Sequence, residues 1–411
     1  MDYALGVSTL RYLLLLSILP NCLFLLLVLD WRVGLVLLVG VMGLFYWQAW
    51  RQGSSFFGIM SNLMRAYGSL PRLVWSLDCR AAEGVGGPET TPARVPLDHT
   101  QFFSDLPPLE ARELQVVVRE THQRLRELFP GSEPADRVLV FSHQQDMLVY
   151  LAGWFGTLGS RAAGFCFAMG PVRVVGAVDA FRELGRDPKA LLAHELVHGG
   201  LRGVARGLAM FPWLNEGLAE ALAVSWFEPA RVPGIQRFLR RARAAGHWMA
   251  WDELSAVRPG HIVAWLKSGD RDQLMKAQLL YSQSCLLVMA LLDREGADHP
   301  CLRAMLRKPG DARQIMLAQL GVAGAGLLAQ VEAEVDASSL ELTPWDRARR
   351  EVLRGLLAQD PPSRFGLSAV IGLAACGDDE DLPTLRAIAS GDDVELASQA
   401  RLALDLLGSI A

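Results

Sequence analysis

The two longest apolar runs of this chain lie near its start. Residues 12–29 and 33–50 each contain 18 residues without a charged side chain. A helix needs roughly 20 apolar residues to cross a bilayer, and aromatic side chains often mark the ends of such a helix. The pattern predicts a two-span transmembrane hairpin over residues 1–50, in contact with a lipid bilayer. A cleaved signal peptide explains it less well, because no small-residue cleavage site follows the first run; a buried hairpin of a soluble domain stays open.

Arginine residues lie on both outer flanks of the predicted hairpin, with only Arg32 in the turn between the two spans. Positive charge is enriched on the cytoplasmic side of membrane proteins, so both flanks are expected in the cytoplasm. The six cysteines are far apart and form no CxxC pair, which agrees with a reducing compartment. We therefore expect the soluble part of the chain in the cytoplasm, with neither a disulfide framework nor a cysteine-based zinc site.

The pattern changes after the hairpin. Residues 51–95 are interpreted as a juxtamembrane segment and linker, because their second half is rich in Gly, Pro and Thr. Apolar positions then recur at helical spacing over residues 108–129. Short apolar runs predict strands at residues 137–141 and 172–175, the second after a turn region at residues 164–170.

From Asp187 onward the pattern is almost wholly helical. Asp187 followed by Pro188 is typical of an N-cap and the first position of a helix, so a helix is predicted to begin there. A mostly helical domain is expected over residues 96–340. Residues 341–411 contain short Ala/Leu-rich helices at 368–376, 382–390 and 394–407, between Gly-Asp-Asp turns.

The C-terminal pattern resembles the end of a HEAT-like helical repeat array. A segment of this kind is a candidate surface for a protein partner. A generic helical cap on the preceding domain explains the same pattern, and both interpretations stay open.

Composition narrows the possible functions. Hydrophobic residues make up 51% of the 411 residues, and the net charge is −4. A chain this apolar is not disordered as a whole. Nucleic-acid-binding domains carry a basic patch or stripe, which the near-neutral charge does not suggest, so no nucleic-acid partner is expected.

The candidate chemistry lies in the segment His194-Glu195-Leu196-Val197-His198. On a helix, residues four apart share a face, so His194 and His198 can offer two imidazoles to one metal ion. Glu195 is rotated by about 100° from His194, where it can reach a metal-bound water rather than the metal. This arrangement suits a general base, and imidazole ligands suit Zn²⁺.

A catalytic zinc takes three protein ligands, so a third must come from elsewhere. Seventeen residues separate His198 from Glu216, enough for a connection and a return into a second helix. We assign Glu216 to the metal. Glu220 lies one turn later on the same face and is predicted to accept the free N–H of a ligand histidine, His194, and so to fix its tautomer.

The HExxH sequence followed by Trp-Leu-Asn-Glu-Gly-Leu-Ala-Glu at 213–220 resembles the gluzincin metallopeptidases, the group of thermolysin and aminopeptidase N. The resemblance implies a gluzincin-like α+β domain, a zinc cofactor and a peptide or protein substrate. It also implies that Glu216 is the third ligand and that Glu220 orients a histidine. The GxMEN-type motif of the exopeptidases is absent, so an endopeptidase is expected.

A closer likeness is to the bacterial peptidase MA-like group, carried by Gly164-Phe165, the strand at 172–175 and the Tyr281-Ser282-Gln283-Ser284 helix. It covers residues 137–335 and implies a bacterial inner membrane for the anchor. The fold likeness implies that the 172–175 strand is the edge on which an extended peptide pairs. Tyr281 is a candidate catalytic group that stabilises an oxyanion; packing in the helix core is its other explanation.

Two functions from different classes fit these features. The first is a membrane-anchored zinc peptidase with Glu195 as general base. The second is a membrane-anchored interaction or scaffold protein whose zinc site is structural or vestigial and whose helical C-terminus binds a partner. Three ligands and a base favour the enzyme, because structural zinc sites supply four protein ligands. The motif does not lie in an apolar run, which argues against an intramembrane protease.

Overall fold

The structure is a computed structural model. It describes residues 100–155, 163–168, 172–183, 185–202, 211–268, 270–295, 324–359 and 366–408. The predicted transmembrane hairpin at 1–50 and the linker at 51–95 lie outside these residues. Both therefore stay predictions.

The described strands form one mixed four-stranded sheet in the order β1-β2-β4-β3. Strands β1 (Gln101–Ser104), β2 (Arg137–Phe141) and β4 (Val172–Ala177) run parallel, and β3 (Gly164–Ala168) runs antiparallel to β4. The strand predicted at 137–141 is confirmed, and the one predicted at 172–175 is extended by two residues. Together with the helices described below, this sheet confirms the α+β class.

The turn predicted at residues 164–170 is wrong, because β3 occupies most of it. Phe165 and Phe167 pack in the larger hydrophobic cluster and Cys166 packs in the smaller one, so side chains on both faces of this strand are buried. The glycine at its start conceals the strand in the sequence. The interpretation of the 172–175 strand as an edge is also wrong: β4 is buried along its whole length and lies between β2 and β3. Among the described strands, β3 is the edge at this end.

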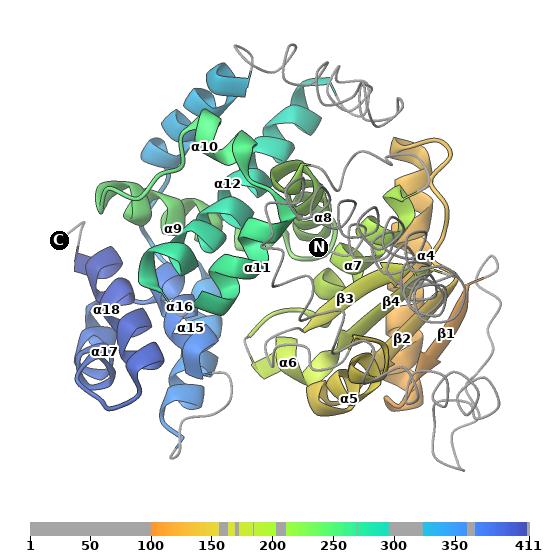
Figure 1. Ribbon diagram of the computed structural model, residues 1–411, viewed down its shortest axis with the longest axis horizontal. Helices are drawn as coiled ribbons and strands as arrows, with labels where there is room; N and C mark the ends of the chain where they lie inside the picture. The colour runs from red at the N-terminus through yellow and green to blue at the C-terminus, as the bar shows by residue number, and fades with distance from the viewer. Residues whose placement is uncertain are drawn as a thin grey trace, which may run out of the picture.

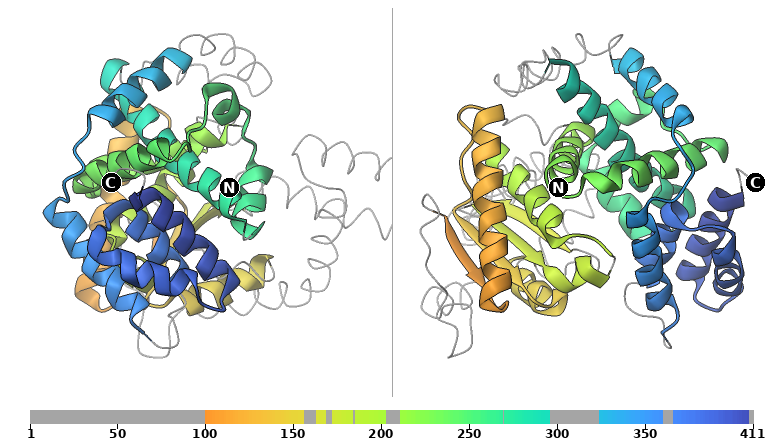
Figure 2. Two further views of the ribbon diagram at one scale, coloured as in Figure 1. Left: turned by 90° about the vertical axis from the view of Figure 1, so that its left-hand side faces the viewer. Right: turned by 180° about the vertical axis from the view of Figure 1, so that it is seen from behind.

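Helices cover both faces of the sheet (Figure 1). Helix α4 (Pro108–Leu128) follows β1 and confirms the helix predicted at 108–129; the view from behind in Figure 2 shows it in front of the strands. Val138, Val140 and Val174 share a cluster with α4 residues, whereas Leu139, Phe141 and Val175 belong to the cluster that contains residues of α5 (Gln144–Phe155). The period-two alternation of the strands thus divides their side chains between two cores.

Helix α7 (Pro188–Leu201) lies against the sheet on the same side as α4 and carries the HExxH segment. Asp187 is its N-cap and accepts the Lys189 N–H at 2.9 Å, and Pro188 is its first residue. The predicted start is confirmed. Side chains of Leu192 and Leu196 pack into the sheet-facing cluster, which fixes the rotation of the helix and turns its histidine face away from the sheet.

Helix α6 (Val178–Glu183) directly follows β4 and precedes α7. After α7 the described helices are α8 (Pro212–Phe227), α9 (Val232–Ala244), α10 (Trp251–Ala256), α11 (Pro259–Ser268) and α12 (Arg271–Glu295). Helix α8 packs between α7 and α12. A Cβ at Gly217 would lie 2.7 Å from the Ser284 carbonyl oxygen of α12. The glycine after Glu216 is therefore required for the close approach of these two helices.

Within the described residues, α12 is the helix long and apolar enough to cross a membrane, and 67% of its apolar window is buried inside the protein. Gln283 in this helix is fully buried and exchanges hydrogen bonds with the backbone N–H and C=O of Met249, at 3.2 and 3.1 Å. These contacts are those of a core helix.

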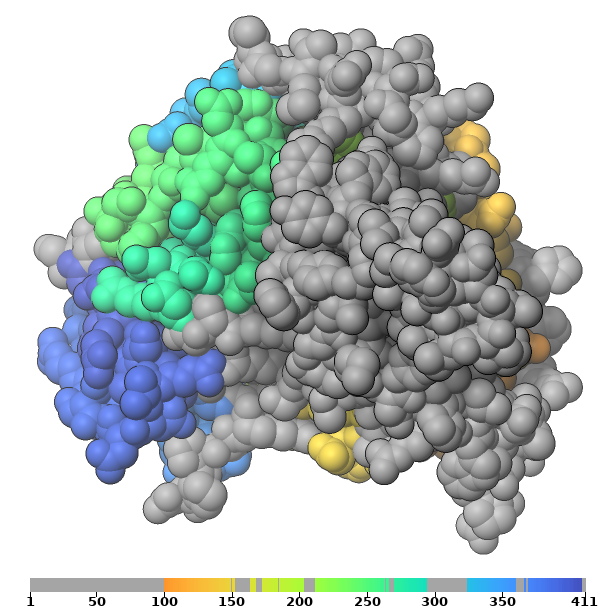
Figure 3. Space-filling view, viewed as in Figure 1, coloured from red at the N-terminus to blue at the C-terminus, as the bar shows by residue number. Residues whose placement is uncertain are grey.

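The C-terminal segment consists of α15 (Pro344–Leu357), α16 (Gly366–Cys376), α17 (Leu382–Ala389) and α18 (Val394–Gly408). The last three agree with the predicted helices. Their buried side chains belong to the same hydrophobic cluster as those of α8, α9 and α12, and Figure 3 shows them, in blue, directly against the green helices. The likeness to a HEAT-like repeat and the boundary at residue 340 stay predictions.

Candidate metal centre

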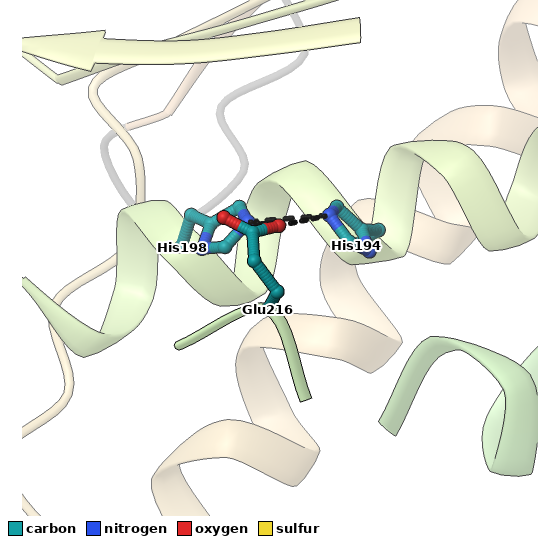
Figure 4. A group of neighbouring side chains, drawn as sticks. All are labelled: His194, His198 and Glu216. Carbon is teal, nitrogen blue, oxygen red and sulfur yellow. Dashed lines mark hydrogen bonds and ion pairs between the residues drawn. The ribbon is translucent and has the colours of Figure 1, made fainter. Parts of the chain in front are cut away.

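Two packed helices bring three candidate ligands together. His194 and His198 lie one turn apart on α7, and Glu216 reaches them from the first turns of α8 (Figure 4). The histidine Nε2 atoms are 3.2 Å apart. A carboxylate oxygen of Glu216 lies 3.6 Å from Nε2 of His194 and 3.5 Å from Nε2 of His198. The three side chains form a compact group of donors that can hold a metal ion.

The opposite ring nitrogens of both histidines have acceptors. Nδ1 of His194 lies 3.1 Å from Oε2 of Glu220, the contact expected from the spacing of the two glutamates. Nδ1 of His198 lies 3.3 Å from Oδ1 of Asn215. If each Nδ1 carries the hydrogen, both Nε2 lone pairs point into the group of donors. These hydrogen bonds select the tautomer that a metal needs.

Asn215 is a site residue that the sequence did not single out, although it stands in the motif directly before Glu216. Its side-chain amide also donates to Oε1 of Glu216 at 3.4 Å. It therefore contacts one ligand from each helix. In the sequence, its role is indicated by its position directly before a ligand, near the start of a helix. Polar residues that cap helices occur at such positions too, so the position alone does not identify a site residue.

The ionisable side chains of this group shift one another's pKa values. Burial lowers the pKa of His194, but hydrogen bonds with Glu216 and Glu220 outweigh burial and raise it to about 10. Burial lowers the pKa of His198 below its usual value. Burial raises the pKa of Glu216, whereas its contacts with both histidines lower it.

Glu195 projects from α7 toward the start of β3 rather than into the group of three ligands. Its side chain is buried, and its charge raises the pKa of His194, which places it near that ring. A Cβ on Gly164 would lie 2.9 Å from Oε1 and 2.9 Å from Cγ of Glu195. The glycine at the start of β3 therefore leaves the space that this carboxylate occupies.

The edge strand beside Glu195 has backbone groups that point outward. The Ala177 N–H donates to the Ala163 carbonyl at 2.9 Å, which makes this a hydrogen-bonded pair of the antiparallel ladder. Hydrogen-bonded and non-hydrogen-bonded pairs alternate. The N–H and C=O groups of Gly164, Cys166 and Ala168 consequently face away from β4.

A layer of buried charges lies behind Glu220. Its Oε1 pairs with Arg231 and lies 3.7 Å from Nη2 of Arg186, and both arginines also pair with Glu228. Burial raises the pKa of Glu220, but Arg231, His194 and Arg186 outweigh it and hold this pKa well below the ordinary value. The sequence did not reveal this layer, because its members show no motif spacing.

Tyr281 lies in α12, half-buried at the edge of the large hydrophobic cluster. Cys285 lies four residues later on the same helical face and is buried. Burial raises the pKa of its thiol, and the nearby charge of Glu220 raises this pKa further. The helix of Tyr281 thus packs beside the charged layer. Oxyanion stabilisation by Tyr281 stays a prediction.

Comparisons with protein-family models, with curated proteins and with solved structures find no match to this chain. The function of the metal centre must therefore be inferred from its residues and their geometry.

Proposed function

We propose that this chain is a zinc-dependent metallopeptidase with a gluzincin-like domain. The observation that carries the proposal is the triangle of donors, with edges of 3.2, 3.5 and 3.6 Å. Ligands at about 2.0–2.1 Å around a tetrahedral zinc lie about 3.3–3.4 Å from one another. Two imidazoles and one carboxylate are also a donor set that zinc prefers over calcium or magnesium.

In this proposal His194, His198 and Glu216 hold the zinc. Three protein ligands leave a fourth position for water or substrate, as in catalytic rather than structural sites. When bound, zinc supplies a Lewis acid for the scissile carbonyl and lowers the pKa of water. Glu220 and Asn215 hold the two histidines in the required tautomer.

Glu195 is the proposed general base. It takes a proton from the attacking water and passes it to the nitrogen of the leaving amine, so that one water is consumed for each peptide bond broken. Its position one residue after His194, outside the group of ligands, supports this role. Tyr281 remains a candidate for stabilising the oxyanion.

The edge strand β3 is the proposed binding site for an extended peptide. The N–H and C=O groups of Gly164 and Ala168 face away from β4 and can pair with the backbone of a peptide. Gly164 also lies next to the Glu195 side chain. A peptide paired here would place a backbone carbonyl near the proposed base. This assignment replaces the edge predicted at residues 172–175.

The deciding experiment compares the wild type with Glu195→Gln at matched zinc occupancy on a broad peptide library. The glutamine keeps the shape of the side chain but cannot accept the proton. Positioned acid–base groups contribute about 10²–10⁴ in rate, so cleavage is expected to fall by at least about 10²-fold with unchanged zinc content. Full activity of Glu195→Gln would contradict the mechanism.

A further inference from the structure

Three buried charged residues lie behind Glu220 and have no part in the proposed chemistry so far: Arg186, Glu228 and Arg231. Their side chains are almost fully enclosed: Arg186 and Arg231 are 16% exposed, Glu220 is 10% exposed and Glu228 is 3% exposed. Enclosing two pairs of charges is energetically unfavourable unless their geometry is well defined. The arrangement therefore calls for a physical explanation.

The layer connects segments that must keep a fixed distance for the metal site to exist. Glu228 is the C-cap of α8, and its Oε1 accepts the N–H of Asp187, the N-cap of α7, at 3.2 Å. Its Oε2 accepts from Arg186 at 3.2 Å. Arg231 follows in the short helix η3 (Pro229–Arg231). The start of the histidine helix is thus tied to the end of the helix that carries Glu216.

Arg231 makes the decisive contact. It donates to Oε1 of Glu220, while Oε2 of the same carboxylate faces Nδ1 of His194 at 3.1 Å. One oxygen is held by the arginine and the other by the histidine, so the carboxylate plane cannot rotate without losing one of two hydrogen bonds. Arg186 reaches the same Oε1 only at 3.7 Å. Because Arg231 makes a direct charge-assisted hydrogen bond, it constrains the orientation of the Glu220 carboxylate more strongly than the longer contact from Arg186 does.

We propose that Arg231 is a positioning residue of the metal site, acting through Glu220 on the orientation of the His194 ring. The inference rests on the proposed zinc site. Arg231 holds the Glu220 carboxylate, and Glu220 in turn holds the His194 ring so that its Nε2 points at the metal. Arg231 itself lies in η3, outside both α7 and α8. Outer partners of ligand histidines typically change metal affinity by about 10- to 100-fold.

The test is a double-mutant cycle on zinc affinity, measured with the full chain in detergent by competition against a chromophoric chelator. Arg231→Met is expected to weaken zinc binding by about 10-fold or more. If the arginine acts through Glu220, then Arg231→Met combined with Glu220→Gln should bind zinc as Glu220→Gln alone does, within about twofold. If Arg231 affects zinc binding independently of Glu220, the effects of the two substitutions should multiply instead.

The matched control is Arg243→Met. Arg243 lies on α9 and is 32% exposed, paired with Glu332 and Asp336 far from the metal ligands in the sequence. Arg243→Met removes the same charge as Arg231→Met but should leave zinc affinity unchanged. The absorption spectrum of the Co²⁺-substituted protein provides a second reading, because a reoriented His194 changes the ligand field in Arg231→Met but not in Arg243→Met.

Circular dichroism and the unfolding midpoint identify a variant that fails to fold. In that case Arg231→Lys, which keeps the charge but loses the planar fork, takes its place in the same cycle. Unchanged zinc affinity, or effects that multiply with those of Glu220→Gln, would overturn the inference. A wild type that binds no zinc would instead overturn the proposed function, so the two failures are distinct.

Discussion

Gly164 and Glu195 are packed so closely that a single methyl group would not fit between them. A Cβ at Gly164 would lie 2.9 Å from both Cγ and Oε1 of Glu195, and 2.7 Å from Cδ1 of Leu191. Distances below 3 Å between such atoms force a shift of one of the groups. The edge strand of the sheet and the proposed general base therefore determine each other's positions.

Gly164→Ala should consequently impair catalysis without emptying the metal site. The methyl group pushes the Glu195 carboxylate from its place, and a displacement of about 1 Å can reduce a rate by about 10²-fold. Zinc content should stay at the wild-type level, because Glu195 is not a ligand. Cleavage rates and metal content, measured on the same preparations, check both expectations.

Gly176→Ala is the matched control for this variant. Gly176 faces Gly164 across the β3–β4 pair, but a Cβ there would lie 3.7 Å from Leu191, an ordinary contact. It should retain nearly full activity. Equal losses in the two variants would show that the strands, and not the space of Glu195, are responsible.

The ligand assignment makes a second prediction. His194→Ala, His198→Ala and Glu216→Ala should each abolish binding of zinc at micromolar concentrations, because each removes one of three ligands. Glu220→Gln should weaken binding by only about 10- to 100-fold. Atomic absorption after gel filtration measures the content, and chelator competition measures the affinity. A Glu220→Gln protein without zinc, beside a Glu216→Ala protein that keeps it, would reverse the two roles.

Local sequence patterns predicted the parts of this site that depend on one helix. The spacing of His194 and His198 gives a shared face, and Asp187 with Pro188 gives the start of the helix that carries them. These features arise from α-helical geometry and from the needs of unpaired N–H groups, both of which act over a few residues.

The sequence did not predict features that depend on contacts between distant segments. Arg186 meets Glu228 across 42 residues, and the side-chain types alone do not indicate which of many charges will pair. Strand β3 was missed because its first residue is a glycine, which is common in turns, while the reason for that glycine lies in Glu195, on another element. The roles of these residues depend on the side chains that they contact in the folded protein, and local sequence patterns do not reveal those contacts.

Membrane attachment is a third prediction, and it rests on the two uncharged 18-residue runs near the start of the chain. The full chain should sediment with membranes and resist extraction by alkaline carbonate, because each run is close to the roughly 20 residues that a span requires. Detergent should release it. Immunoblots of the soluble and membrane fractions give the answer, and recovery of the full chain in the carbonate supernatant would contradict a spanning hairpin.

A fourth prediction concerns how the C-terminal helices are joined to the half that contains the candidate metal site. Arg237 on α9 donates to Asp346 of α15 at 2.8 Å, and both side chains are 0% exposed. The same arginine donates to the carbonyls of Leu340 and Glu341. Asp346 also closes a capping box with Thr343 at the start of α15. One buried ion pair therefore anchors the entry of the C-terminal segment.

Arg237→Met should lower the free energy of unfolding by about 3–5 kcal/mol, because it leaves the Asp346 carboxylate buried without its cation. Arg243→Met removes an equally charged but partly exposed partner from the same helix and should lower it by no more than about 1 kcal/mol. Urea titrations of the zinc-loaded protein, followed by tryptophan fluorescence and by zinc release, measure both. Since the two halves share one hydrophobic cluster, both probes should shift together in Arg237→Met. Two separate transitions, of which only the one without zinc release moves, would show instead that residues 341–411 unfold as an independent domain.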